Sequence, residues 1–285
     1  MPELILGTAN FSRDYGQKIG KNFKAKNARE ILRTAQLKGI NHFDTAKSYL
    51  GAEKILGQEL DNIKTVKIDS KISASDCISV ESIINSVKVS LTQLKVPSLS
   101  TLYLHSPTLL LGEKANFIET ALDYVIDFGL AKNLGVSVYD YEDIIKCKLK
   151  YSGLTRFQIN ENICDQRLLN CEVLNDLSNE GNKFFIRSIF LQGLLLMNPN
   201  NLSGEFKKAK NQIQQLNTFA QDNNTTVIDL CLAYVKSIPW ATGIVFGVDT
   251  ASQLEEVLES DFTLPSDWKR YISTIPTNIL DPRNW

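Results

Sequence analysis

Short apolar runs alternate with amphipathic helical patterns along the whole chain. The apolar runs predict β-strands at 4–7, 40–44, 66–71, 99–105, 133–138, 154–160, 183–189 and 242–247. Apolar residues that recur every three or four positions predict helices at 28–38, 52–60, 80–94, 115–128, 205–221, 227–237 and 251–258. Eight strands separated by helices predict an α/β fold, a single-domain (β/α)8 TIM barrel over residues 1–285.

The alternative fold is an open, doubly wound sheet. That fold requires a glycine-rich phosphate loop after its first strand. Here Gly7 is followed by Thr8, Ala9 and Asn10, and the chain contains no Gly-x-Gly-x-x-Gly motif. The Walker, His-Glu-x-x-His and Gly-x-Ser-x-Gly motifs are also missing from the sequence. The pattern therefore favours the closed barrel.

Charge and composition argue against several kinds of partner. The 285 residues include 31 Lys and Arg and 32 Asp and Glu, so we expect neither nucleic acid nor a membrane as a partner. The apolar runs are too short to span a bilayer, and no basic and apolar leader follows Met1, which predicts a cytoplasmic location. Five cysteines without a Cys-x-x-Cys motif predict free thiols and no metal site.

Four side chains with acid–base chemistry fall at or just beyond the ends of three consecutive predicted strands. Asp44, Lys71 and His105 each end a strand pattern, and Tyr49 lies in the loop after the second strand. In a barrel of this kind, the carboxyl ends of the strands carry the active site. A neighbouring ammonium lowers the pKa of a phenol. We therefore expect Lys71, held charged by Asp44, to tune Tyr49 as a proton donor to a carbonyl oxygen that His105 orients.

Each of these residues has an ordinary structural interpretation when it is taken alone. Asp44 could cap a turn, Tyr49 could be a loop aromatic, Lys71 could be solvated, and His105 could be a structural histidine. The conjunction of the four favours chemistry. His42, the other histidine, points to the same side of its strand as Asp44 and is expected inside the barrel.

The chain resembles an aldo/keto reductase. The segment Asp44-Thr45-Ala46, followed by Tyr49, Glu53 and Leu56-Gly57, resembles the first signature of that family, and Ser70-Lys71 and Leu104-His105 resemble two further catalytic positions. The resemblance implies a (β/α)8 barrel and a nicotinamide cofactor, usually NADPH, with NADH left open. It also implies Tyr49 as general acid, Lys71 and Asp44 as the residues that tune it, and His105 as the residue that positions the carbonyl.

The cofactor-binding pattern of the family is matched less completely. The resemblance places the cofactor on Gly7, Thr8, Ser137, Gln158, Arg187, Ser188, Phe190, Gln192, Gly193, Gly247, Val248 and Gln253. Val138 stands where an amide is usual, and Arg187 stands where an aromatic ring often stacks on the nicotinamide. Gly247 and Gln253 replace the Lys and Arg that often hold the 2′-phosphate of NADPH. Thr250 and Gln253 also form a Thr-x-x-Gln helix cap, which is a sufficient structural reason for both.

Three functions stay open at this stage. The first is reduction of an aldehyde or ketone, possibly a sugar carbonyl, by NADPH or NADH. The second is a non-catalytic, cofactor-binding sensor or subunit of the same family, and the third is a barrel hydrolase or lyase that uses Asp44 and His105. The expected partner is a small carbonyl substrate. The pocket loops, with a tail from about 262 packed near the site, contain Phe11, Tyr15, Tyr139, Asn160, Glu161 and Trp285. The pattern fixes neither the substrate nor the oligomeric state.

Overall fold

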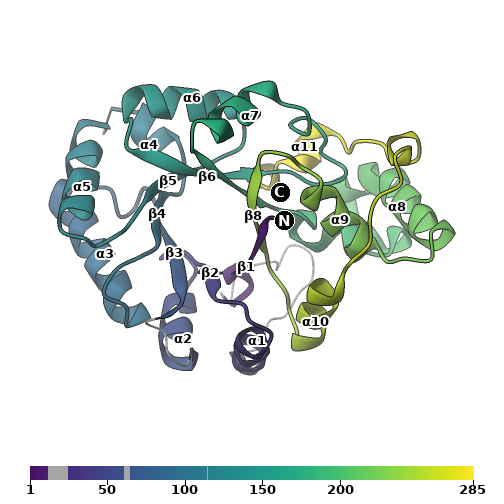
Figure 1. The fold of residues 1–285 in the computed structure, drawn as a ribbon, viewed down its shortest axis with the longest axis horizontal. Coiled ribbons are helices and arrows are strands. Elements are labelled where there is room, and N and C mark those ends of the chain that lie inside the picture. The colour runs from purple at the N-terminus through teal and green to yellow at the C-terminus, as the bar shows by residue number, and fades with distance from the viewer. Residues whose placement is uncertain (12–24, 61–64, 114) are drawn as a thin grey trace.

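Eight parallel strands close into a barrel in which each strand pairs with its neighbour in sequence and β8 pairs with β1. The structure is a computed structural model that describes residues 1–11, 25–60, 65–113 and 115–285. The strands are β1 (Glu3–Gly7), β2 (His42–Asp44), β3 (Lys67–Ile72), β4 (Thr101–Leu104), β5 (Leu134–Val138), β6 (Leu154–Asn160), β7 (Lys183–Arg187) and β8 (Ala241–Phe246). Figure 1 shows the helices surrounding this ring of strands. The predicted (β/α)8 barrel is confirmed.

The helices follow the strands in the expected order. They are α1 (Ala25–Leu37), α2 (Ala52–Glu59), α3 (Val80–Leu94), α4 (Thr108–Leu111), α5 (Ala115–Asp127), α6 (Tyr141–Lys150), α7 (Glu172–Asn179), α8 (Lys210–Asp222), α9 (Val227–Lys236), α10 (Ala251–Glu259) and α11 (Thr277–Leu280). The sequence pattern missed the short helices α4 and α11 and also α6 and α7. The buried side chains of α6 are Ile144 and Cys147, and that of α7 is Leu174. With so few buried apolar positions, neither segment shows the periodic pattern that predicts a helix.

Helix α3 shows how local sequence sets an element that the site depends on. Its first turn is closed by a capping box in which Ser79 and Ser82 satisfy each other's backbone amides. Its apolar stripe, which includes Ile83 and Val87, is buried against the barrel. Since both the cap and the stripe are local features, the predicted bounds of this helix agree with the observed ones.

The barrel interior is filled by a small cluster of its own. Ile5, Tyr103, Phe185 and Val245 form a core separate from the large cluster between strands and helices. His42 lies in this interior with its ring 6.3 Å from the Phe185 ring, which confirms its predicted place. Its Nε2 is 2.9 Å from Asp69 Oδ2 and its Nδ1 is 3.2 Å from Glu3 Oε2. These side chains fill the barrel interior below the carboxyl ends of the strands.

Two further observations bear on partners. In the part of the chain that the structure describes, no helix is long and apolar enough to cross a membrane. Across the same residues, no group of three or more His, Cys, Asp or Glu side chains is placed to hold a metal ion.

The close approach of α2 to α3 yields a prediction at Gly57. A Cβ there would lie 2.1 Å from the Gln93 carbonyl oxygen, and backbone atoms cannot move aside as a flexible side chain can. We expect Gly57→Ala to lower the free energy of unfolding by about 3 kcal/mol, measured by urea denaturation. The exposed neighbour variant Gln58→Ala is the control and should change stability little. Equal stability of the two variants would contradict the packing described here.

Candidate active site

A buried ion pair joins the ends of β2 and β3. Lys71 Nζ donates to Asp44 Oδ2 at 2.6 Å and to the Thr45 carbonyl oxygen at 2.9 Å. The second carboxylate oxygen, Asp44 Oδ1, accepts from Gln158 Nε2 of β6 at 2.5 Å. All three residues are at most 4 % exposed. Strands that lie apart in sequence thus meet at one carboxylate.

Tyr49 and His105 complete the group of four residues predicted as catalytic. Lys71 Nζ lies 5.4 Å from the centroid of the Tyr49 ring. The rings of Tyr49 and His105 are 6.1 Å apart, with their planes at 83°. The structure therefore brings all four predicted side chains together at the carboxyl ends of β2, β3 and β4.

The pKa of Tyr49 differs from the sequence-based expectation. Burial raises the pKa of the phenol, and the nearby Asp44 carboxylate raises it further, whereas Arg187 acts in the opposite direction. Lys71 does not lower the pKa as expected, because its charge is compensated by Asp44 at 2.6 Å. Tyr49 is therefore a neutral phenol at physiological pH and retains the proton that a general acid needs.

His105 is also neutral. Burial lowers the pKa of its imidazole to about 4, and the positive charges of Lys71 and Arg187 act in the same direction. The Ser48 hydroxyl lies 3.4 Å from His105 Nδ1. In the tautomer in which Ser48 donates to Nδ1, the ring proton lies on Nε2, where it can be donated to a carbonyl oxygen.

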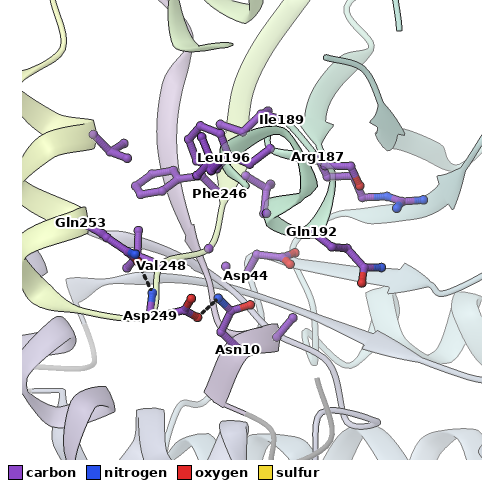
Figure 2. Close-up of a pocket in the computed structure, with 18 of the residues that line it drawn as sticks. Asn10, Asp44, Arg187, Ile189, Gln192, Leu196, Phe246, Val248, Asp249 and Gln253 are labelled. Atoms are coloured by element: carbon purple, nitrogen blue, oxygen red, sulfur yellow. Dashed lines mark hydrogen bonds between the residues drawn. The ribbon is translucent and has the colours of Figure 1, made fainter. Parts of the chain in front are cut away.

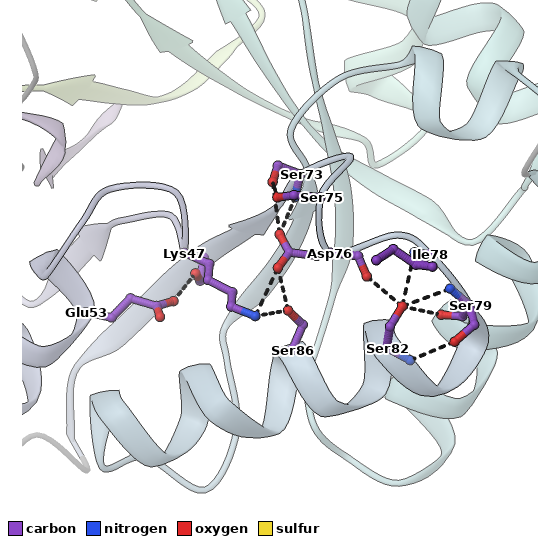
Figure 3. A network of polar contacts seen from close by, with 10 residues as sticks. Lys47, Glu53, Ser73, Ser75, Asp76, Ile78, Ser79, Ser82 and Ser86 are labelled. Atoms are coloured by element: carbon purple, nitrogen blue, oxygen red, sulfur yellow. Dashed lines mark hydrogen bonds and ion pairs between the residues drawn. The ribbon is translucent and has the colours of Figure 1, made fainter.

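The segment that carries Tyr49 is anchored to the next loop through Lys47, as Figure 3 shows. Lys47 Nζ is 2.9 Å from Asp76 Oδ1 and also donates to the Ser86 hydroxyl of α3. Ser86 in turn donates to Asp76 Oδ1 at 2.6 Å. The backbone amide of Lys47 donates to the Lys71 carbonyl oxygen at 3.2 Å. These contacts hold the loop between Asp44 and Tyr49 against β3 and α3.

Glu53, in the first turn of α2, also anchors a segment of the site. Its side chain is 2 % exposed, and its Oε1 accepts from the Ser70 hydroxyl at 2.6 Å. Burial raises the pKa of this carboxyl group, although hydrogen bonds from Ser70 and Ser90 oppose the shift. Since Ser70 directly precedes Lys71, this bond fixes the strand next to the ion pair.

A pocket opens beside the ion pair and contains about 1140 Å³ of empty space, its open mouth included. Its walls come from the ends of β1, β2, β6, β7 and β8 and the segments that follow them (Figure 2). The predicted cofactor-binding residues among its lining are Gly7, Gln158, Arg187, Ser188, Phe190, Gln192, Gly193, Gly247, Val248 and Gln253. Thr8 and Ser137 are buried and do not line the pocket, and the Thr8 hydroxyl donates to the Asp44 carbonyl oxygen at 3.1 Å.

The segment after β7 has an unusual backbone. Ser188, Leu191 and Gln192 have φ angles of 63°, 47° and 54°, and Gly193 has a φ of 90°. Non-glycine residues rarely adopt this left-handed conformation, and its clustering at a pocket indicates a constrained binding surface. The sequence analysis predicted Ser188, Phe190, Gln192 and Gly193 of this segment as cofactor-binding residues, but not its left-handed backbone.

The opposite end of the pocket contains a contact that the sequence pattern missed. Asn10 Nδ2 donates to Asp249 Oδ1 at 2.8 Å, and both residues line the pocket (Figure 2). Thr250 caps α10 by accepting from the Gln253 amide at 3.2 Å, while Gln253 Oε1 accepts from the Asp249 amide at 2.8 Å. The structural role predicted for Thr250 and Gln253 is thus confirmed. Tyr15, predicted near the substrate, lies outside the described residues.

The family assignment follows from comparison with known proteins. The model of the aldo/keto reductase family matches residues 3–275. The chain belongs to the aldo/keto reductase family. Members of this family are generally oxidoreductases that bind nicotinamide cofactors, and the family also includes non-catalytic channel subunits.

Individual relatives of this aldo/keto reductase are distant. A probable voltage-gated potassium channel subunit beta from Arabidopsis thaliana is 24% identical over 284 residues, which covers 87% of this chain and 85% of that protein. A glycerol dehydrogenase from Gluconobacter oxydans has a TM-score of 0.74 at 18% identity, covering 94% of this chain and 89% of that one. An aldo-keto reductase from Bacillus halodurans, solved in its holo form, has a TM-score of 0.73 at 18% identity, covering 94% and 90%. These structures share the fold.

Two polar groups of this aldo/keto reductase, one in the pocket lining and one bonded to a lining residue, fit a nicotinamide. Gln158 Oε1 and Asn160 Nδ2 are buried and have no hydrogen-bond partner among the described residues. One is an acceptor and the other a donor, which matches the two ends of a carboxamide. Ser188, which lines the pocket, holds Asn160 through a 3.1 Å bond to Asn160 Oδ1.

The two histidines give a direct test of the site's electrostatics. The pKa of His105 is lowered to about 4. Burial opposes protonation of His42, but Asp69 and Glu3 outweigh it and raise the pKa of His42. We expect two imidazole proton NMR signals, one that titrates near pH 4 and one that titrates above the usual value of about 6.5.

Only two histidines are present, so the variant His105→Gln assigns both signals. Because the pKa of His105 is lower in the folded than in the unfolded protein, its contribution to stability should be lost as pH falls from about 6.5 towards 4. A His105 signal that titrates at pH 6.5 or above would show that the imidazole is solvated.

Proposed function

We propose that this protein reduces an aldehyde or ketone to an alcohol with NAD(P)H, and that Tyr49 is the general acid. The observation that carries the proposal is the neutral Tyr49 phenol beside the Lys71–Asp44 pair and the neutral His105 imidazole. A proton donor and a hydrogen-bond donor thus lie next to each other. Both are needed to polarise and protonate a carbonyl oxygen.

The chain offers a site for each part of the cofactor. Gln158 and Asn160 would hold the carboxamide, with Asn160 supplying the amide that Val138 lacks. The backbone of Gln192 and Gly193 would hold the pyrophosphate, and Gly247 with the start of α10 would hold the adenosine end. A bound reduced nicotinamide supplies the hydride.

The protein's own residues orient the carbonyl group and supply the proton that its oxygen receives. His105 donates a hydrogen bond to the carbonyl oxygen and orients it. The Tyr49 hydroxyl gives its proton to that oxygen as the hydride reaches the carbon, so that the product is the alcohol. The phenolate left behind is stabilised by the charge of Arg187, and it regains a proton from solvent.

A non-catalytic subunit is the second candidate. The observation in its favour is the similarity to a protein named as a probable potassium channel subunit beta. Cofactor binding is common to both candidates, so only turnover separates them.

Replacing Tyr49 with Phe tests the proposal. We expect kcat for carbonyl reduction to fall by roughly 10²- to 10⁴-fold because the general acid is removed. The Kd for the cofactor, measured by calorimetry, should be retained. Tyr271→Phe, at an exposed tyrosine, is the matched control and should keep full activity. Unchanged turnover in the Tyr49 variant would mean that the proton comes from another group.

The choice of cofactor can be tested at Asp249. The resemblance favours NADPH, and NADH is the alternative because Asp249 places a carboxylate in the lining near the expected 2′-phosphate. We expect Asp249→Asn, which can still accept from Asn10, to shift the ratio of the Kd values toward NADPH by roughly fivefold or more. Asp222→Asn on α8, which does not line the pocket, is the control. An unchanged ratio would place the 2′-phosphate elsewhere.

A further inference from the structure

Arg187 is the last residue of β7, and it lines the same pocket as Asp44 and Tyr49. Figure 2 shows its side chain directed away from the end of the pocket formed by Asn10, Asp249 and Gln253. Burial is the largest influence on the pKa of Tyr49 and of His105, and the Arg187 charge lowers both. The guanidinium is therefore close enough to both groups to act on them electrostatically.

Two guanidinium groups lie over the ring of Tyr139. The central carbon of Arg187 is 4.7 Å from the ring centroid, and that of Arg283 in the C-terminal tail is 3.7 Å from it. Arg283 is paired with Asp281 through a 2.6 Å contact from Nη2 to Oδ2 and a 2.9 Å bond from Nε to Oδ1. The charge of Arg283 is thus compensated.

Arg187 differs from Arg283 in this respect. Its Nη2 donates to the Val138 carbonyl oxygen at 3.2 Å. Its Nε is buried, and among residues 1–11, 25–60, 65–113 and 115–285 it has no hydrogen-bond partner. Within those same ranges, no carboxylate oxygen lies within 4.0 Å of this guanidinium. Arg187 is a half-buried cation with spare donors.

The net charge of the site depends on Arg187. Lys71 and Asp44 cancel, and His105 is neutral above a pH of about 4. The Asp281 carboxylate interacts with Arg187 as well as with Arg283, so these two guanidinium groups and one carboxylate together carry one net positive charge beside the pocket. In a partly dehydrated site such a charge is unfavourable by itself and is stabilised by an anion that enters the pocket.

We propose that Arg187 binds an anionic group, a carboxylate or a phosphate, on the carbonyl substrate, so that this enzyme prefers anionic aldehydes or ketones. The proposal rests on the reductase function argued above. A guanidinium presents a planar fork of donors that matches two oxygens of either group. The Tyr139 ring and the Val138 carbonyl hold the plane of that fork.

The competing role for Arg187 is the one expected from sequence, stacking on the nicotinamide. Two observations weigh against it. The guanidinium is already engaged by the Tyr139 ring and the Val138 carbonyl oxygen. The oxidised nicotinamide also carries a positive charge, so a permanent cation stacked on it would be repelled.

Kinetics with matched pairs of substrates test the proposal. Succinic semialdehyde is compared with butanal, and glyceraldehyde 3-phosphate with glyceraldehyde, so that the two arms separate carboxylate from phosphate. The variants are Arg187→Gln, Arg187→Lys and, as a matched control on the same ring, Arg283→Gln. We expect the wild type to prefer the anionic member of at least one pair in kcat/KM.

In Arg187→Gln the ratio of kcat/KM for the anionic over the neutral substrate should fall by roughly 10- to 100-fold, mainly through KM. Arg187→Lys should restore part of the ratio because it keeps the charge but loses the fork. Arg283→Gln should leave the ratio close to that of the wild type. A wild type without anionic preference, or an Arg187→Gln variant that keeps the preference, overturns the proposal. So does an Arg187→Gln variant whose loss is matched by weaker cofactor binding.

A binding measurement separates this proposal from the reductase function. Succinate and inorganic phosphate are titrated by calorimetry into the protein with NADPH or NADH present. We expect Arg187→Gln to weaken binding of at least one of them by roughly tenfold or more, and Arg283→Gln to have little effect. Anion binding that depends on Arg187 without turnover of any carbonyl would refute the reductase function alone. Turnover without such binding would refute the anion site alone.

Discussion

The arrangement of this site depends on the buried ion pair between Lys71 and Asp44. The pair joins neighbouring strands, and Gln158 reaches the same carboxylate from β6 across the barrel. Dehydrating two charges is unfavourable, so a buried pair of this kind adds little net stability compared with apolar residues of similar size. Its retention in a well-packed barrel is explained by what it positions. With both carboxylate oxygens occupied, the ammonium is fixed beside the Tyr49 ring.

The neutrality of this pair sets the protonation state of its neighbours. Since the ammonium is compensated, burial dominates for both the phenol and the imidazole, and each stays in its uncharged form. Tyr49 in the pocket lining and His105 beside it are then two neutral donors, a state suited to hydrogen bonding and protonating a carbonyl oxygen. Arg187 is the exception to this balance. Its charge lowers the pKa of both groups, so under the proposed anion site substrate charge and acid strength are linked through one side chain.

Features that are set by residues adjacent in the chain could be predicted from the sequence, whereas features that depend on contacts between distant residues could not. The eight strands, and Asp44, Lys71 and His105 at or just beyond their ends, could be predicted because an apolar run and the polar residue that follows it are adjacent in the chain, and Tyr49 lies only five residues after Asp44. Helix α7 could not be predicted, since Leu174 is its one fully buried side chain. The bond between Asn10 and Asp249 spans 239 positions and arises only when the barrel closes. The direction of the Tyr49 pKa shift was wrong for the same reason, because burial is a property of the folded protein.

The segment after β7 shows how the barrel supports a conformation that its own sequence disfavours. Ser188, Leu191 and Gln192 adopt left-handed backbone angles, which cost of order 1 kcal/mol or more each for non-glycine residues. The conformation persists because Leu191 and its neighbours Leu194 and Leu195 are completely buried. The apolar side chains thus anchor the segment while its backbone lines the pocket. A binding surface held in this way is formed before any ligand arrives, so binding need not include the free-energy cost of ordering it.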